Sequence, residues 1–203
     1  MTSIGDYAFY DCGRLVEVVN KSTHITVEKG SELNGYVGYY ALAVYNNGDT
    51  FESKLSNDNG YIIYTDGEEK ILVGYTGMET DLILPSYVTK INQYAFYWCK
   101  SLTSVVISDS VTSIGNRVFY NCDGLTSVTI GDGVTSIGYG AFYGCSSLTN
   151  VYYNGTASEW SAISISSVNN SSLTDATRYY YSETEPTEEG NYWHYVDGVP
   201  TKW

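Results

Sequence analysis

Hydrophobic and polar positions repeat along this chain over a distance much longer than a single strand or helix. Segments with the pattern Ile-x-x-x-x-Phe-x-x-Cys-x-x-Leu begin at Ile91, Ile114 and Ile137, and each begins 23 residues after the one before it. A fixed period of this size indicates a stack of small structural units, because no single unit can bury a hydrophobic face alone.

Each repeat predicts two short strands and one compact turn. The pattern Leu-x-x-Val-x-Ile at residues 102–107 predicts a strand, and residues 111–114 predict a second extended piece. The Gly-x-x-Ala-Phe stretch that follows predicts a one-turn helix. Equivalent positions of stacked coils lie about 4.8 Å apart, so Phe96, Phe119 and Phe142 are expected to form one internal column.

The pattern is less regular elsewhere. A first copy occupies residues 4–15, and residues 37–42 resemble an eroded copy. Residues 60–75 contain two β-rich runs around Asp66-Gly67, which predict a β-hairpin that replaces or decorates one coil. The expected domains are an incomplete N-terminal repeat (1–20), a degenerate repeat with the hairpin insertion (21–84), three regular repeats (85–155) and a C-terminal cap with an aromatic tail (156–203).

The C-terminal segment predicts elements that cover the open end of the stack. Residues 157–163 predict a short helix, with Ser158 as its N-cap and with Trp160 and Ile163 on one side. Tyrosines 179–181 and the segment 192–203 predict hairpin strands with a turn at Asp-Gly. A solenoid needs such a cap, because its last coil otherwise exposes core residues and an unpaired strand edge.

The repeat pattern I-G-x-x-A-F-x-x-C-x-x-L-x-x-V-x-I-x-x-x-V-T-S resembles the BspA-like leucine-rich repeat proteins, a bacterial surface-antigen family. The resemblance is close over 1–20 and 85–155 and looser over 21–84. Departures from the pattern occur at Asn92, Val118 and Tyr153. The resemblance implies a leucine-rich-repeat solenoid, mainly β with short one-turn helices. It also implies a secreted or surface-displayed protein that adheres to host or matrix proteins.

Charge is distributed unevenly over a net charge of −13. Residues 85–155 carry three acids and three bases, whereas residues 21–84 carry ten acids and four bases, and residues 156–203 carry seven acids and two bases. Nucleic acid requires a basic footprint, so no nucleic-acid partner is expected. The acidic surface is expected to keep the irregular segments soluble.

Two expectations concern membranes and the N-terminus. The sequence contains no apolar run long enough to span a bilayer, so no transmembrane segment is expected. The chain enters a repeat at Ile4 without the pattern of a signal peptide. We therefore expect a fragment of a longer protein, with possible self-association through the uncapped coil of residues 1–20.

The sequence offers little for catalysis or metal binding. One cysteine falls in each full repeat, at Cys12, Cys99, Cys122 and Cys145. Stacked positions about 4.8 Å apart are slightly too distant for a disulfide, so buried free thiols are expected. The two histidines are isolated, and no closely spaced ligands or paired catalytic carboxylates appear. We expect no enzyme activity, no metal and no cofactor.

Three sets of residues are candidate binding surfaces. Burial of the apolar strand positions turns an exposed strand face outward, formed by Ser104, Val106, Ser127, Thr129, Asn150 and Tyr152. The residue after each core phenylalanine forms a tyrosine column of Tyr10, Tyr97, Tyr120 and Tyr143. An aromatic tail contains Tyr192, Trp193, Tyr195 and Trp203.

Each surface has an interpretation without a ligand. Short hydroxyl side chains are ordinary on a solvent face of a sheet, and tyrosines that stack on one another stabilise a turn ladder. The tail resembles one unit of the aromatic cell-wall-binding repeats, but that family arrays several units, so a capping role is preferred. The leading hypothesis is an adhesion-type interaction module for a protein or glycan, and the alternative is a structural spacer with no ligand of its own.

Overall fold

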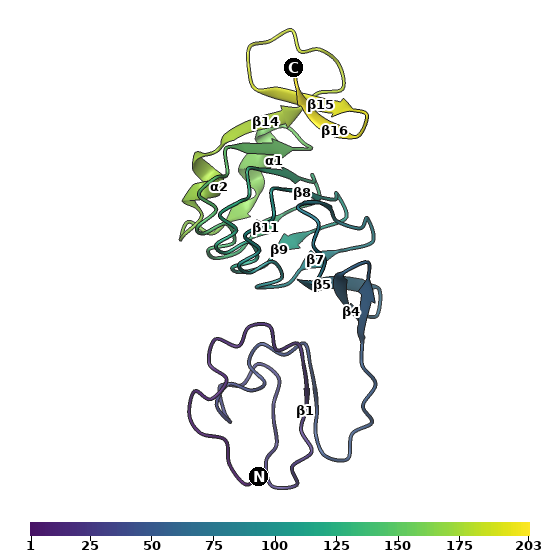
Figure 1. Ribbon diagram of the computed structural model, residues 1–203, viewed down its shortest axis with the longest axis vertical. Helices are drawn as coiled ribbons and strands as arrows, with labels where there is room; N and C mark the ends of the chain where they lie inside the picture. Colours follow the sequence, from purple (N-terminus) through teal and green to yellow (C-terminus); the bar gives the residue numbers. More distant parts are fainter. The chain divides into compact units, whose positions relative to one another are not determined.

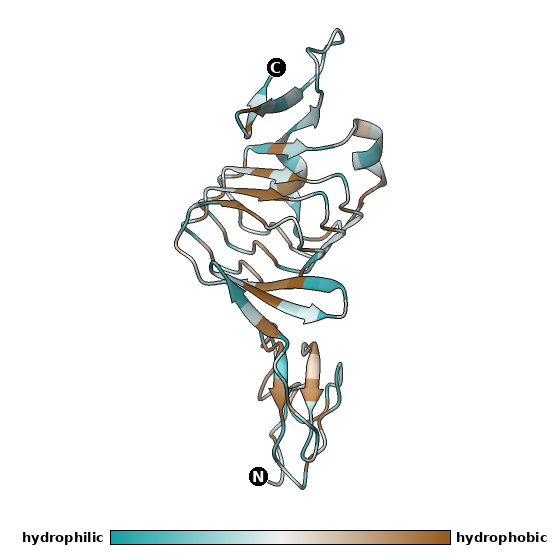
Figure 2. Ribbon diagram, turned by 90° about the vertical axis from the view of Figure 1, so that its right-hand side faces the viewer, coloured by the Kyte–Doolittle hydropathy of each residue, from teal (hydrophilic) through white to brown (hydrophobic).

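The computed structural model describes residues 1–203 in full, and the chain forms two compact units, Met1–Leu55 and Ser56–Trp203 (Figure 1). The second unit contains the regular repeats. Its strands follow the repeat of the sequence, and the brown, hydrophobic segments of Figure 2 lie along them.

The second unit is built on two seven-stranded sheets. The first has the order β16-β15-β14-β12-β10-β8-β6, and we call it the long-strand sheet. Its strands are β6 (Asp81–Ile83), β8 (Ser104–Ile107), β10 (Ser127–Ile130), β12 (Asn150–Tyr153), β14 (Thr177–Tyr181), β15 (Tyr192–Val196) and β16 (Val199–Lys202). From β6 to β15 neighbouring strands are parallel, and the register follows the repeat, since Val128 lies opposite Val105 and Val151.

The second sheet has the order β13-β11-β9-β7-β5-β4-β3, and we call it the short-strand sheet. Its strands are β3 (Leu55–Asp58), β4 (Tyr61–Asp66), β5 (Glu69–Tyr75), β7 (Lys90–Ile91), β9 (Ser113–Ile114), β11 (Ser136–Ile137) and β13 (Ser164–Ile165). The antiparallel pair β4–β5 is the predicted hairpin, and β5 continues in parallel into β7. The hairpin therefore provides the strand on which the first regular coil stacks.

The turn around each core phenylalanine differs from the predicted one-turn helix. Tyr94 and Trp98 have left-handed φ values of 61° and 62°, and Gly140 and Gly144 take the same conformation two coils later. A left-handed residue at every fourth position cannot continue a helix of L-residues. It turns alternate amides toward the next coil instead, as the N–H of Phe96 does when it donates to the carbonyl of Val118 at 3.0 Å.

The core of the second unit is one continuous cluster that follows the stacked coils. Phe96, Phe119 and Phe142 are each fully buried, and consecutive rings stack with centroids 5.1 Å apart. This confirms the predicted column. Equivalent leucine, valine and isoleucine positions of the strands join the same cluster, so each coil is stabilised by contacts with its two neighbours.

The chain after β12 forms one longer coil and then a hairpin. Helix α1 (Ala157–Ala162) has Thr156 as its N-cap, so the prediction of Ser158 was wrong. The Thr156 side chain accepts from the N–H of Glu159, and the Glu159 carboxylate accepts from the N–H of Thr156, which together form a capping box. Trp160 and Ile163, which were predicted on one side of this helix, both pack into the core cluster.

A second short helix lies where the backbone hydrogen bonds between successive phenylalanine turns end. Helix α2 (Ser171–Asp175) replaces the phenylalanine turn in the last coil, and Asn170 precedes it. The Asn170 side chain accepts from the N–H of Phe142 at 3.2 Å and donates to the carbonyls of Gly138 and Ser166. A buried side-chain amide thus takes the place of the missing backbone partners. The predicted turn between β15 and β16 at Asp197-Gly198 is confirmed.

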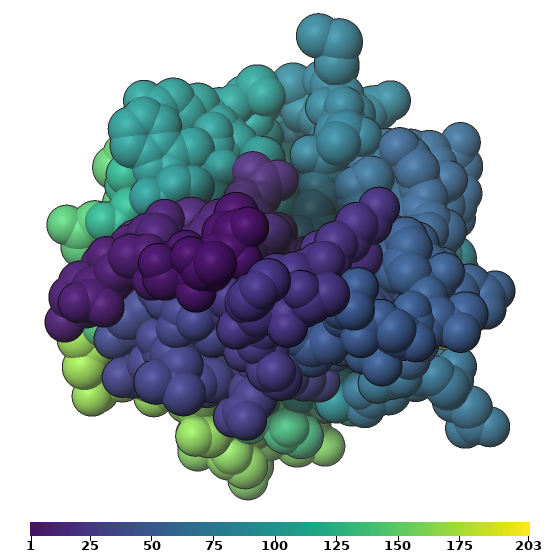
Figure 3. Space-filling model, turned by 90° about the horizontal axis from the view of Figure 1, so that it is seen from below, coloured from purple at the N-terminus to yellow at the C-terminus, as the bar shows by residue number.

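The first unit contains two stacked coils joined by the parallel strands β1 (Glu17–Val19) and β2 (Ala43–Tyr45). Val18, Val37 and Ala41 lie in a small core, against which Phe9 packs. The N–H of Phe9 donates to the carbonyl of Gly35 at 2.7 Å, which is the same inter-coil bond as in the regular repeats. Figure 3 shows this unit from below as a packed surface in purple and violet-blue.

We predict that Leu125→Ala lowers the free energy of unfolding of the chain by about 2 to 5 kcal/mol, because it opens a cavity between two flanking coils. Leu125 has no exposed surface. Ser127→Ala, two residues further along the same coil, is the matched control and should cost far less, since Ser127 is half-buried on the outer face. Urea denaturation of both variants provides the measurement. Equal losses would contradict the assignment of inward and outward positions.

Candidate functional site

The outer face of the long-strand sheet is more covered than its sequence predicts. A row of side chains in register crosses this face, formed by Ile83, Val106, Thr129, Tyr152 and Tyr179. Ile83 is 70% exposed, as an outward residue should be. Thr129 and Tyr152, however, are only 2% and 9% exposed, so their prediction as exposed binding residues was wrong.

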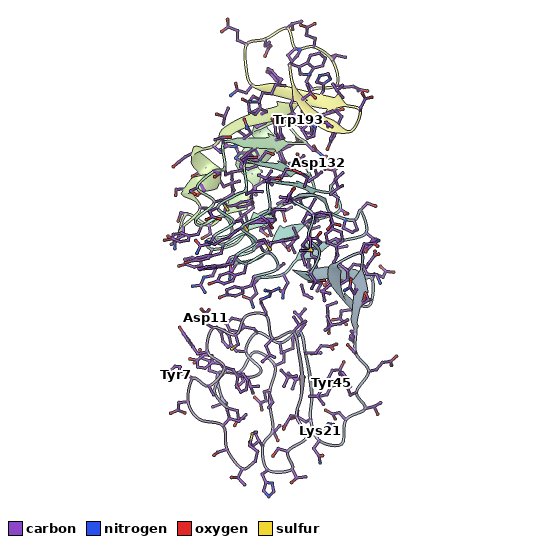
Figure 4. All side chains as sticks on the ribbon, in the orientation of Figure 1. Tyr7, Asp11, Lys21, Tyr45, Asp132 and Trp193 are labelled. Atoms are coloured by element: carbon purple, nitrogen blue, oxygen red, sulfur yellow. The ribbon has the colours of Figure 1, made fainter.

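The aromatic tail explains why this part of the face is buried. Trp193 of β15 is fully buried, and its Nε1–H donates to the carbonyl of Tyr153 at 2.9 Å (Figure 4). Its ring meets the ring of Tyr152 edge-on, with centroids 5.5 Å apart. The tail therefore packs back onto the face that the repeats alone would leave open.

Predicted residues of two separate sets meet here in one group, which we call the outer-face aromatic cluster. It consists of Tyr152, Tyr179, Tyr181, Trp193 and Tyr195. Ring centroids of neighbours in the cluster lie 4.8 to 6.3 Å apart. Tyr181 and Tyr195 are 38% and 40% exposed, so the cluster has a buried base and an accessible rim.

Polar groups border the outer-face aromatic cluster. The Lys202 ammonium lies 4.4 Å from the ring centroid of Tyr179 and donates to the side-chain oxygen of Asn150 at 2.9 Å. Aromatic rings beside a cation and an amide are suited to contacts with a protein or a sugar. Asn150, predicted on the exposed strand face, is thereby brought to the same site as the tail.

A polar network continues from the cluster to the ends of the strands. Asp109 accepts from the side chain of Asn154 at 2.7 Å and from the backbone N–H of Asp132 at 3.2 Å. Burial raises the pKa of Asp132, and the carboxylates of Asp109 and Glu159 add to the effect. Burial also raises the pKa of Tyr195 further above neutral pH.

The tyrosine column is a stack rather than a row of open faces. Tyr97 and Tyr120 stack with centroids 5.2 Å apart, and Tyr120 and Tyr143 with centroids 4.8 Å apart. Both faces of the Tyr120 ring are covered by its neighbours, so this ring presents only its edge and its hydroxyl to solvent. Tyr10, also predicted for this column, lies in the first unit and packs there edge-on against Tyr36.

Two residues of the predicted tail set lie away from the cluster. Trp203 stacks on His194 with centroids 3.8 Å apart and donates from its indole nitrogen to the carbonyl of Ser182. Tyr192 is half-buried at the start of β15. Both are placed to stabilise the terminal hairpin.

The structure also contains a groove that the search for binding residues in the sequence missed. It has a volume of about 430 Å³ and lies along the short-strand sheet, with Ser113, Ser136 and Ser164 among its lining residues. The signal was present in the sequence, because two repeats carry Thr-Ser-Ile, at residues 112–114 and 135–137, and Ser164 likewise precedes an isoleucine in the last coil.

The cysteines and acids form no catalytic or metal-binding arrangement. None of the four cysteines forms a disulfide. Cys122 and Cys145 are buried, whereas Cys99 is half-buried and Cys12 is exposed, so the expectation of burial was wrong for Cys12 and only partly met for Cys99. Burial raises the pKa of Cys145 to about 12, which keeps that thiol protonated and unreactive. No group of three or more His, Cys, Asp or Glu side chains is placed to hold a metal ion.

None of the helices has the length and hydrophobicity required to cross a bilayer.

Comparison with known proteins gives a family and a shared fold. The family model described as the BspA type leucine-rich repeat region matches residues 1–31 and 75–182, with six copies. No curated protein matches the chain.

Several solved structures resemble the chain. A leucine-rich repeat protein from Bacteroides capillosus is 22% identical, with a TM-score of 0.54, over 63% of this chain and 99% of its own, which shows the common fold. A leucine-rich cell surface protein from Faecalibacterium prausnitzii is 31% identical over 51% of this chain and 34% of its own, with a TM-score of 0.45. A leucine-rich repeat protein from T. pallidum is 25% identical over 50% of this chain and 54% of its own, with a TM-score of 0.45. The chain thus spans about a third and about half of these last two proteins.

We predict that Trp193→Ala lowers the free energy of unfolding by about 3 to 5 kcal/mol, because it removes a fully buried indole and its hydrogen bond to Tyr153. Trp203→Ala is the control, since Trp203 is 45% exposed, and it should cost less. Urea denaturation followed by far-UV circular dichroism compares the two. Similar losses for both variants would show that Trp193 does not fasten the tail to the sheet.

Proposed function

Because the chain belongs to the BspA-type leucine-rich repeat family, we propose that it is a secreted or surface-displayed interaction module of the adhesion type. Its ligand is a protein or a glycan, bound through the surface of the solenoid. The observation that carries the proposal is the outer-face aromatic cluster, whose buried Trp193 supports two accessible rings, Tyr181 and Tyr195.

The geometry of this cluster fits the known chemistry of recognition surfaces. Tyrosine provides a large contact area at a low cost in conformational entropy, and it adds a hydroxyl for hydrogen bonding. A rim of accessible rings around a rigid base is already ordered before a ligand arrives, which reduces the entropy lost on binding. Lys202 and Asn150 add polar contacts at the border.

The second candidate is a structural spacer within a longer surface protein. The observation that favours it is the tyrosine column, because stacked rings whose faces cover one another stabilise the coils without leaving a face for a ligand. An enzymatic function has the least support, since the hydroxyl that lies beside a histidine, Thr23 Oγ1 at 3.0 Å from His24 Nδ1, is on the exposed surface between neighbouring residues.

We predict that Tyr181→Ala combined with Tyr195→Ala weakens ligand binding roughly tenfold or more, because both rings belong to the accessible rim of the cluster. The ligand is first selected by screening the full chain against immobilised collagen, fibronectin and laminin and against an array of glycans. Surface plasmon resonance then compares the variants.

The matched control is Tyr97→Ala combined with Tyr120→Ala, which removes two rings from the tyrosine column. These substitutions should lower the melting temperature and leave the affinity unchanged. The opposite outcome, lost binding with a retained melting temperature, would move the site to the tyrosine column. A screen with no ligand, together with retained function in a longer protein that carries an unrelated solenoid, would favour the spacer.

A further inference from the structure

The groove along the short-strand sheet has the properties of a second binding site. Three of its lining residues, Ser113, Ser136 and Ser164, lie side by side in register on β9, β11 and β13. Gly115 and Gly138 line it where the chain leaves these strands. A Cβ atom at Gly115 would lie 2.7 Å from the backbone nitrogen of Gln93, so only glycine allows the coils to approach this closely. We call this site the serine groove.

The hydroxyls of the serine groove have unused hydrogen-bonding capacity. Ser113, Ser136 and Ser164 make no side-chain hydrogen bond with the protein. In contrast, the preceding residues Thr112 and Thr135 each donate to a carbonyl of the neighbouring coil, at 3.1 and 3.0 Å. The stack therefore uses one hydroxyl of each Thr-Ser pair for its own stability and leaves the other unpaired.

The same groove is also lined by a side chain whose hydrogen-bond donor has no partner. The side-chain nitrogen of Asn92, a lining residue, is buried and has no partner among the protein's groups. A buried polar group without a partner destabilises the fold, because it has lost its hydrogen bonds to water. Because this nitrogen has almost no accessible surface, a ligand oxygen satisfies it only when the Asn92 side chain turns toward the groove.

The charge of the serine groove selects an uncharged ligand. None of its lining residues is charged, although the chain carries a net charge of −13. Lys90, the register neighbour of Ser113, is neutralised by an ion pair with Glu69. Anionic polymers meet no cation in the groove and are repelled by the chain as a whole.

The spacing of the groups selects an extended polymer. Neighbouring coils lie about 4.8 Å apart, so the groove offers the same hydroxyl on three successive coils over a distance of roughly 10 Å. Successive sugar residues of an extended β-1,4-linked polysaccharide advance by nearly this interval. Because alternate rings are turned over, they meet successive serines with opposite ring edges, each of which carries hydroxyl or ring oxygens. A peptide is a poorer fit, because the backbones of β9 and β11 are paired on both sides and short serine side chains form no pocket for an apolar anchor.

We propose that the serine groove binds an extended, uncharged, β-1,4-linked polysaccharide along the axis of the stack, with successive sugar hydroxyls bonded to the serines of successive coils. This inference rests on the proposed function of an interaction module and names a glycan as one of its ligands. The groove uses residues separate from the outer-face aromatic cluster, so the two sites can be tested independently.

The test measures binding of two neutral hexasaccharides, cellohexaose and xylohexaose, to the full chain by isothermal titration calorimetry. The triple variant Ser113→Ala, Ser136→Ala and Ser164→Ala is expected to lower the association constant roughly tenfold or more, since it removes three hydrogen bonds to the ligand. Ser146→Ala, which removes an exposed serine that does not line the groove, is the matched control and should bind as the wild type does. Polygalacturonate, an anionic chain, should not bind.

A second variant guards against loss of fold. Ser136→Tyr fills the middle of the groove while leaving the other two serines in place, and it should abolish binding with an unchanged circular dichroism spectrum. The proposal is overturned if neither hexasaccharide binds the wild type, or if the folded Ser136→Tyr variant or the triple variant binds as tightly as the wild type. In those cases, a ligand that still depends on Tyr181 and Tyr195 would leave the proposed function intact.

Discussion

The backbone hydrogen bonds between successive coils are the interaction on which the rest of this structure depends. Because the repeat is 23 residues long in the regular region, the amides and carbonyls of one coil meet the same groups of the next. The bonds extend beyond the strands, since the N–H groups of Phe96 and Phe119 donate to the next coil from within the turns. A change of length within a coil would disrupt this pairing and shift every side-chain column that is built on it.

The constant spacing also explains where the candidate binding surfaces lie. Positions that repeat with each coil form columns, and their chemistry is multiplied along the stack, as with the serines of the groove and the stacked rings of the tyrosine column. The outer-face aromatic cluster arises differently. It forms where the repeat ends, because the tail returns over the long-strand sheet and brings Trp193 against Tyr152.

Features that depend on the repeat could be predicted from the sequence, and features that depend on distant or subtle contacts could not. The phenylalanine column and the hairpin of β4 and β5 follow from the period and from local turn residues. The covering of Tyr152 involves Trp193, which lies some 40 residues further along the chain, and no local pattern reports it. The N-cap at Thr156 was missed although Thr156-Ala-Ser-Glu159 carries the capping-box signal.

The turn of each coil tests the central role of inter-coil bonding most directly, because alternate amides there have different partners. In the second regular repeat, Arg117, Phe119 and Asn121 donate to the neighbouring coil, whereas Tyr120 and Cys122 donate to carbonyls within their own turn. Hydrogen–deuterium exchange resolved by residue, in the native full chain, measures the difference. Slow exchange at Arg117, Phe119 and Asn121, close to that of the strand amides of β10, is the predicted result, with faster exchange at Tyr120. Uniformly fast exchange across residues 117–122 would show that the turns do not take part in the inter-coil ladder and would contradict this account.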